Sequence, residues 1–172
     1  MPVLIAMCGL PFSGKSVLAG ALSRELRIRV LSYDYGIYPV HSRQAPAGSS
    51  VAAEYDFVQD IARREIGAIL ASGESLIYDD LLLERDDRRK LAVVAKAHLA
   101  HLVLVYLDTP LSVIDQRRAA NSRTRTSVPE AMMRLGISLL EPPEDGERAI
   151  YVGPDYVLPE ILAKVSARLT GG

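Results

Sequence analysis

The sequence is poor in the residues that build disulfides and metal sites based on sulfur or imidazole. It has one cysteine in 172 residues, so an intrachain disulfide is impossible and a zinc site built on cysteines is excluded. That cysteine, Cys8, lies in an apolar run, where we expect a buried and inert thiol. The histidines do not have the spacing of metal ligands. They are His41, His98 and His101.

Long apolar runs and an excess of one charge are also missing. No apolar run reaches the length that spans a bilayer, and no positive charges precede the apolar start at 1–10. The net charge is −1 and the pI is about 6.3. This balance argues against a basic surface over the whole chain, although it allows a local basic groove. We therefore expect a cytoplasmic protein that is not bound to a membrane.

Patterns of strand and helix alternate along the chain, and the length suits one domain over residues 1–172. Short apolar runs predict strands, and amphipathic stretches between them predict helices. Strands separated by helices predict an α/β fold, with a five-stranded parallel sheet flanked by helices. The predicted strands are 3–8, 29–33, 76–78, 102–107 and 149–152.

Three further stretches carry local predictions. Residues 38–50 contain two prolines, a glycine and serines, and predict a loop. Residues 84–90 mix charges of both signs and predict a solvated helix start. A later helix should end at the Glu-Pro-Pro sequence of 141–143 and bury a stripe of four apolar residues. These are Met132, Leu135, Leu139 and Leu140.

Residues 9–16 carry the motif G-x-x-x-x-G-K-[ST] between a predicted buried strand and a predicted amphipathic helix. In such a loop, backbone N–H groups at a helix N-terminus point at the β- and γ-phosphates of a nucleotide. Lys15 adds positive charge, and the Ser16 hydroxyl is a ligand for Mg²⁺. Phe12 is predicted to have a negative φ. The motif predicts ATP binding through Gly9, Pro11, Phe12, Ser13, Gly14, Lys15, Ser16 and Val17.

Carboxylates follow two of the predicted strands, at the edge where parallel sheets bind ligands. In a kinase, Asp34 would accept the proton of the acceptor hydroxyl or orient that hydroxyl, and a solvated turn is the alternative. Asp79 and Asp80 end the third strand, where a carboxylate can hold Mg²⁺. Position favours Asp79 over Asp80, and a helix N-cap is the alternative role.

Arginines crowd a polar stretch that predicts a lid at about 117–127. Guanidinium groups stabilise the charge that spreads over a transferring phosphoryl group, so Arg117 and Arg123 are predicted to be catalytic. A mobile loop that carries them would also exclude water on closing. The alternative is an exposed basic loop without a role.

The phosphate loop, the Leu-Asp-Thr-Pro sequence at 107–110 and the Glu-Pro-Pro sequence at 141–143 together resemble a known family. It is the P-loop kinase family of polynucleotide 5′-hydroxyl kinases, chloramphenicol phosphotransferases and zeta-type toxins. The resemblance implies that Asp34 is the acceptor-site aspartate, that Asp79 ends the third strand near the metal, and that Arg117 belongs to the nucleotide side.

This sequence departs from that family at several positions, among them Asp80 and Leu81 after the aspartate of the third strand. Phe12 replaces the usual glycine, and Asn121 stands where a second lid arginine usually lies. Ile37 stands where the polynucleotide kinases carry an arginine for the phosphate of the acceptor. The last departure and the slightly negative charge favour a small-molecule acceptor over a nucleic acid.

The sequence therefore predicts a kinase that moves the γ-phosphate of ATP, with Mg²⁺, to a hydroxyl of a small molecule. The alternatives are a nucleic-acid 5′-hydroxyl kinase, a nucleotide-binding module without transfer activity, and an ATP-hydrolysing motor. The intact Lys15 and Ser16 with Asp34 favour transfer over binding alone, and the chain is short for a motor. Tyr35 and Tyr38, in the stretch after Asp34, suit a small polar acceptor.

Overall fold

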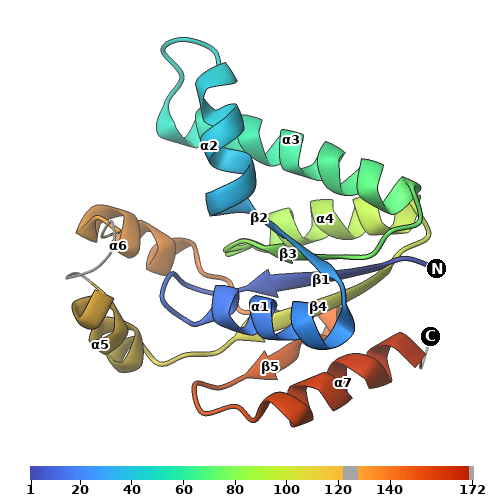
Figure 1. Cartoon of the computed structure of the whole chain (residues 1–172). Coiled ribbons are helices and arrows are strands. Elements are labelled where there is room, and N and C mark those ends of the chain that lie inside the picture. The colour runs from blue at the N-terminus through green and yellow to red at the C-terminus, as the bar shows by residue number, and fades with distance from the viewer. Residues whose placement is uncertain (122–127, 171–172) are drawn as a thin grey trace.

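The computed structural model of the chain describes residues 1–121 and 128–170. Its centre is a parallel five-stranded sheet in the order β2-β3-β1-β4-β5 (Figure 1). This confirms the predicted α/β fold, and each predicted strand boundary lies within one residue of the observed one. Within the described ranges, no helix is both long enough and apolar enough to cross a bilayer. The strands are β1 (Val3–Cys8), β2 (Arg29–Ser32), β3 (Leu76–Asp79), β4 (His101–Leu107) and β5 (Ile150–Val152).

Helices cover both faces of the sheet, because the strands send alternate side chains into two apolar clusters. On β1, Leu4 and Ala6 pack with α3 and α4, whereas Ile5 and Met7 pack with α1 and α7 (Figure 1). The sheet is therefore the middle layer of three. The covering helices are α1 (Lys15–Leu26), α3 (Val51–Ala71), α4 (Arg85–Ala97) and α7 (Leu158–Thr170).

The segment after β2 is helical where the sequence predicted a loop. A π-helical turn at Tyr33–Ile37 continues into α2 (Tyr38–His41) and a 3₁₀ turn at Ser42–Gln44. Pro39 lies in the first turn of α2, where a missing N–H is tolerated. Tyr33 and Ile37 are buried in the α3 and α4 cluster, so tertiary packing outweighs the composition that predicted a loop.

Helix α6 (Glu130–Leu139), which follows α5 (Leu111–Asn121), buries only part of the predicted stripe. Leu139 and Leu140 are partly buried against an apolar cluster, whereas Met132 and Leu135 are each 47% exposed. The buried residues of the helix are Met133 and Gly136. A Cβ on Gly136 would lie 3.7 Å from Leu10 Cδ2, so the helix contacts the phosphate loop through its smallest residue. The apolar pattern missed this contact because it gives glycine no weight.

The charged start of α4 is mostly exposed, as the sequence predicted, but it contains one buried arginine. Arg88 is only 3% exposed and donates to both carboxylate oxygens of Glu147, at 2.6 and 3.0 Å. Its Nη1 also donates to the carbonyls of Leu82 and Leu83, at 3.1 and 3.0 Å. This bidentate pair fixes the connection between β3 and α4 against the 3₁₀ turn at Asp145–Glu147.

We expect Arg88→Ala to lower the free energy of unfolding by about 3 kcal/mol, because Glu147 loses its partner and two carbonyls lose a donor. Chemical denaturation measures the change. Lys90→Ala removes the exposed pair with Asp86 and should leave the midpoint nearly unchanged. Equal losses in the two variants would show that the Arg88 contacts do not hold this region.

Candidate active site

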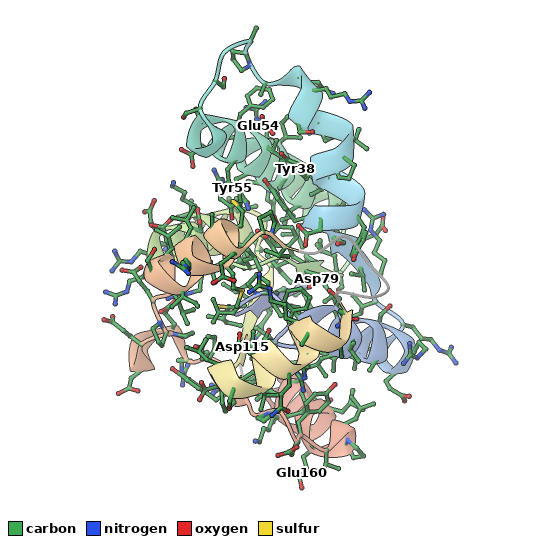
Figure 2. The ribbon with its side chains drawn as sticks, turned by 90° about the vertical axis from the view of Figure 1, so that its left-hand side faces the viewer. Tyr38, Glu54, Tyr55, Asp79, Asp115 and Glu160 are labelled. Carbon is green, nitrogen blue, oxygen red and sulfur yellow. The ribbon has the colours of Figure 1, made fainter. Side chains whose placement is uncertain are left out.

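Three neighbouring strands bring the predicted site residues to the carboxyl edge of the sheet. Asp79 of β3 pairs in register with Met7 of β1 and with Ser32 of β2. The phosphate loop starts at Gly9, two residues beyond Met7, and Asp34 lies two residues beyond Ser32. Figure 2 looks at this edge, with Asp79 between the α2 and α3 region and α5. Parallel sheets bind their ligands at this edge.

Short backbone contacts shape the phosphate loop. Gly9 N donates to the carbonyl of Leu81 at 2.9 Å, and Ser13 N donates to the carbonyl of Leu10 at 3.2 Å. Gly9 has a φ of +137°, and a Cβ there would lie 3.0 Å from the Leu107 carbonyl oxygen. The close approach of β4 therefore requires glycine at this position.

Phe12 contradicts the prediction of a negative φ. Its φ is +62°, in the left-handed region that strains residues with a Cβ. The ring packs against a cluster under α5 and α6 that includes Leu10, Ile114 and Met133. The sequence-based prediction was wrong because this packing offsets the local strain. The ring also covers part of the loop on the α5 and α6 side.

Lys15 is buried, at 7% exposed, and its Nζ donates to the Leu10 carbonyl at 2.8 Å. Burial lowers the pKa of Lys15, and the charges of Asp79, Asp80 and Asp34 act in the opposite direction. The ammonium is therefore desolvated and lies among carboxylates, while its hydrogen bond goes to a neutral carbonyl. A phosphate oxygen could replace that carbonyl without breaking an ion pair among the described residues.

The two aspartates at the end of β3 have different surroundings. Tyr78 faces the α3 and α4 cluster and Ile77 the α1 and α7 cluster, so alternation places Asp79 on the α1 face with Lys15. Asp79 accepts no hydrogen bond from the described residues. Asp80 accepts from Gln59 Nε2 at 2.6 Å, Tyr78 OH at 3.1 Å and Leu81 N at 2.7 Å.

Burial raises the pKa of Asp80 to about 6, and the three hydrogen bonds oppose that rise. The Asp80 oxygens are therefore occupied by protein donors, whereas those of Asp79 are open to a cation. Between the two carboxylates that the sequence offered for a metal, the structure favours Asp79.

The oxygen donors at this edge fit Mg²⁺. The Ser16 side chain is exposed in the first turn of α1, and Asp79 lies on the face of the sheet that α1 covers. Mg²⁺ is usually held by one or two protein carboxylates together with substrate phosphates and water. Within the described residues, no group of three or more His, Cys, Asp or Glu side chains is arranged to hold a metal ion.

Asp34 lies in the π-helical turn after β2 and has an exposed side chain. Partial desolvation raises the pKa of Asp34, the charge of Lys15 lowers it, and the charge of Asp79 raises it further. Asp34 therefore lies within electrostatic reach of both Lys15 and Asp79. A carboxylate with a raised pKa is a better proton acceptor than an ordinary aspartate.

Arg117, in α5, reaches back to the phosphate loop. Its Nη1 donates to the carbonyls of Ser13 at 2.7 Å and Phe12 at 3.3 Å, and Thr109 Oγ1 donates to the Ser13 carbonyl at 3.0 Å. A Cβ on Gly14 would lie 3.3 Å from Arg117 Nη1. In this structure Arg117 therefore supports the loop backbone on the nucleotide side.

Of the predicted lid, only residues 117–121 lie within the described part of the chain. Arg123 and residues 122–127 lie outside the described residues. On either side of them, Arg118 Nη1 donates to Glu130 Oε2 at 2.5 Å, and Arg118 Nη2 donates to the Val128 carbonyl at 3.3 Å. This arginine therefore joins α5 to the start of α6.

Sequence reasoning missed a buried polar network behind the site. Gln59 of α3, which is buried, donates to Tyr55 OH at 2.9 Å as well as to Asp80. The apolar stripe of α3 predicted which face of the helix is buried, but it did not predict that Gln59 is buried on that face. The network connects the end of β3 to Tyr55 of α3, whose ring packs against that of Tyr33.

The fold and this loop define a P-loop nucleotide-binding protein. The chain matches the model of a family described as an AAA domain over residues 4–143, most of its length, and so belongs to that family. No curated protein is similar in sequence.

Solved structures of two kinases and of Kti12 share the fold. A sugar kinase from a Janibacter species has a TM-score of 0.75 at 19% identity, over 98% of this chain and 95% of that one. A gluconokinase from Sinorhizobium meliloti has a TM-score of 0.68 at 23% identity, over 99% and 93%. Kti12 from Chaetomium thermophilum, in complex with ADP-AlF3, has a TM-score of 0.74 at 15% identity, over 98% and 100%.

The strained φ of Phe12 predicts an unusual order of stabilities. Phe12→Gly and Phe12→Ala both remove the ring, but only glycine relieves the strain, so we expect the glycine variant to be more stable by about 1 kcal/mol. Chemical denaturation of both variants measures the difference. Val93, in helix α4, is the control position. There the alanine variant should be more stable than the glycine variant, because a helix interior favours alanine. An alanine variant at position 12 as stable as the glycine variant would contradict the expectation.

Proposed function

We propose that the chain transfers the γ-phosphate of ATP to a hydroxyl group of a small molecule. The observation that carries this proposal is the proximity of Lys15, Asp79 and Asp34 beside the phosphate loop. Phosphoryl transfer depends mainly on positioning and on electrostatic stabilisation, which these groups can supply. The likeness to a sugar kinase, to a gluconokinase and to a protein that binds ADP-AlF3 supports it.

In the proposed reaction, the acceptor oxygen forms a bond to the γ-phosphorus while the bond from that phosphorus to the β–γ bridging oxygen breaks. Asp34 accepts the hydroxyl proton, and ADP leaves with the bridging oxygen. Lys15 would neutralise phosphate charge. Ser16 and Asp79 would hold Mg²⁺, which supplies further charge neutralisation. Arg123 stays a prediction for the transferring phosphoryl group.

A buried side chain favours a small-molecule acceptor over a nucleic acid. Ile37 is only 1% exposed, within the cluster formed by α3 and α4. That position therefore offers neither charge nor surface to a nucleic-acid phosphate, which several cationic contacts usually bind. We further propose that the chain works in the cytoplasm as one domain, with the lid at about 117–127.

A transfer screen tests the proposal directly. The protein is incubated with Mg²⁺, γ-labelled ATP and a panel of hydroxylated small molecules, and a 5′-hydroxyl oligonucleotide serves as the nucleic-acid arm. Label in a small-molecule phosphate monoester supports the proposal. Label only in the oligonucleotide would establish the nucleic-acid kinase instead, and nucleotide binding without labelled product would establish a binding module.

The role of Asp34 has a pH signature. Asp34→Asn should lower turnover by about 10² and leave ATP affinity near the parent value, because only the proton acceptor is lost. The raised pKa of Asp34 means that the carboxylate protonates at a higher pH than an ordinary aspartate, so parent turnover should fall as pH drops through that pKa. This acid limb should disappear in the variant.

Initial rates across pH, with ATP affinity measured separately, check both expectations. Asp145→Asn, the same change at an exposed position, is the matched control and should behave like the parent protein. Unchanged turnover in Asp34→Asn would show that this aspartate is a turn residue. A loss of MgATP affinity would place it at the metal instead.

A further inference from the structure

A group of three tyrosines and one glutamate lies in the turn that contains Asp34 and in the helices after it, and it has no part in the phosphate chemistry. The Tyr33 ring lies between those of Tyr38 and Tyr55, with centroid distances of 5.8 and 5.5 Å. Tyr38 OH donates to Glu54 Oε1 at 2.5 Å. Figure 2 shows Tyr38, Glu54 and Tyr55 together on α2 and α3, above Asp79 in that view. We refer to these four residues, Tyr33, Tyr38, Glu54 and Tyr55, as the tyrosine wall.

One hydroxyl of the tyrosine wall has no partner. Tyr33 is only 4% exposed, and its OH is buried without a hydrogen bond to any described residue. A buried polar group of this kind destabilises the protein unless something else satisfies it. Burial raises the pKa of Tyr33, and the charges of Asp80, Asp34 and Glu54 raise it further. The hydroxyl is therefore a neutral donor that lies near carboxylates and makes no hydrogen bond to them.

Cations of the surrounding helices are engaged elsewhere or lie outside the wall. His41 Nε2 contacts Glu65 Oε1 at 2.9 Å, and Arg63 pairs with Asp60 at 2.5 Å. Arg43 is exposed in the 3₁₀ turn beyond α2. Glu54 belongs to the wall and Asp34 follows Tyr33 in the same turn, and neither carboxylate pairs with a cation among the described residues. A ligand that carries a carboxylate or phosphate next to the wall would be repelled.

We propose that the tyrosine wall, with Asp34, binds a polyhydroxylated acceptor that carries a protonated amine or no charge, and that it disfavours acceptors with a carboxylate or phosphate. This inference rests on the proposed kinase function and adds the class of acceptor. Tyrosine faces pack against the C–H faces of a polyol and attract an ammonium group. Glu54 accepts hydrogen bonds from hydroxyl or ammonium donors, and an acceptor oxygen satisfies Tyr33 OH.

Three probes that share one carbon skeleton test the charge preference: glucitol, 1-amino-1-deoxyglucitol and gluconate. Binding is measured by calorimetry on the full chain loaded with Mg²⁺ and AMPPNP. We expect the neutral and amine-bearing probes to bind at least about tenfold more tightly than gluconate. A factor of this size corresponds to one repulsive contact between the carboxylate of gluconate and a carboxylate at the wall. Glu54→Gln should lower the affinity for the amine-bearing probe, relative to that for glucitol, about fivefold or more. The affinity for glucitol itself should change less than about twofold.

Glu74→Gln is the matched control, because this exposed glutamate pairs with Arg29 away from the wall, and it should change none of the three affinities. Tighter binding of gluconate, or an unchanged amine advantage in Glu54→Gln, would overturn the inference. If none of the three probes binds to protein that still binds MgATP, the inference is also overturned. If Lys15→Ala binds MgATP as tightly as the parent protein does, the result counts against the proposed function instead.

Tyr33→Phe separates ligand recognition from structure. The variant removes only the unsatisfied hydroxyl, so the protein without acceptor should be as stable as the parent or more stable. Affinity for glucitol should nevertheless fall about threefold or more, because a hydrogen bond to the ligand is lost. A purely structural tyrosine would not give these opposite effects. Unchanged glucitol affinity in Tyr33→Phe would contradict the role of this hydroxyl.

Discussion

The two-residue period of β3 is the constraint on which the site depends. Successive side chains of a strand point to opposite faces of the sheet, so two adjacent aspartates at the end of β3 enter different environments. Asp79 lies on the face of α1 with Lys15, and Asp80 lies on the face of α3 with Gln59. A shift of one residue in register would exchange them and place the hydrogen-bonded carboxylate beside the phosphate loop.

This division separates the proposed nucleotide side of the site from the acceptor side. On the α1 side, the loop, Lys15 and Asp79 offer a cation, backbone donors and an open carboxylate. On the α3 side, Asp80 is held through Gln59 to Tyr55 of α3, whose ring packs against that of Tyr33. Asp34 lies at the boundary, where the charges of both Lys15 and Asp79 reach it. A proton acceptor for the transfer reaction needs that position between the two substrates.

Charge balance at this edge agrees with a substrate that arrives with a divalent cation. Three carboxylates act on the buried ammonium of Lys15, and Arg117 also contacts the loop. Among these described groups, negative charges therefore outnumber positive ones before any ligand binds. A nucleotide that brought only its phosphates would add to the repulsion. Mg²⁺ beside Asp79 would reduce it, and the low-dielectric surroundings of Lys15 would strengthen each remaining attraction.

The features that local sequence determines were predictable, and those that depend on tertiary contacts were not. The strands and the phosphate loop follow from short apolar runs and from the Gly9 and Lys15 motif. The φ of Phe12, the buried Arg88 and the amide of Gln59 depend on partners that are distant in sequence. Arg88, for example, is satisfied by Glu147, 59 residues away. The Tyr33–Ile37 turn is helical because its apolar side chains pack under α3, which a loop-like composition does not reveal.

A crystal structure of the chain with Mg²⁺ and AMPPNP tests the central claim most directly. The account predicts that Lys15 Nζ exchanges the Leu10 carbonyl for phosphate oxygens and that the metal lies beside Ser16 and Asp79. It also predicts that Asp80 keeps its hydrogen bonds to Gln59 and Tyr78. A metal bound to Asp80, or a Lys15 that stays on the Leu10 carbonyl while the nucleotide is bound, would contradict it.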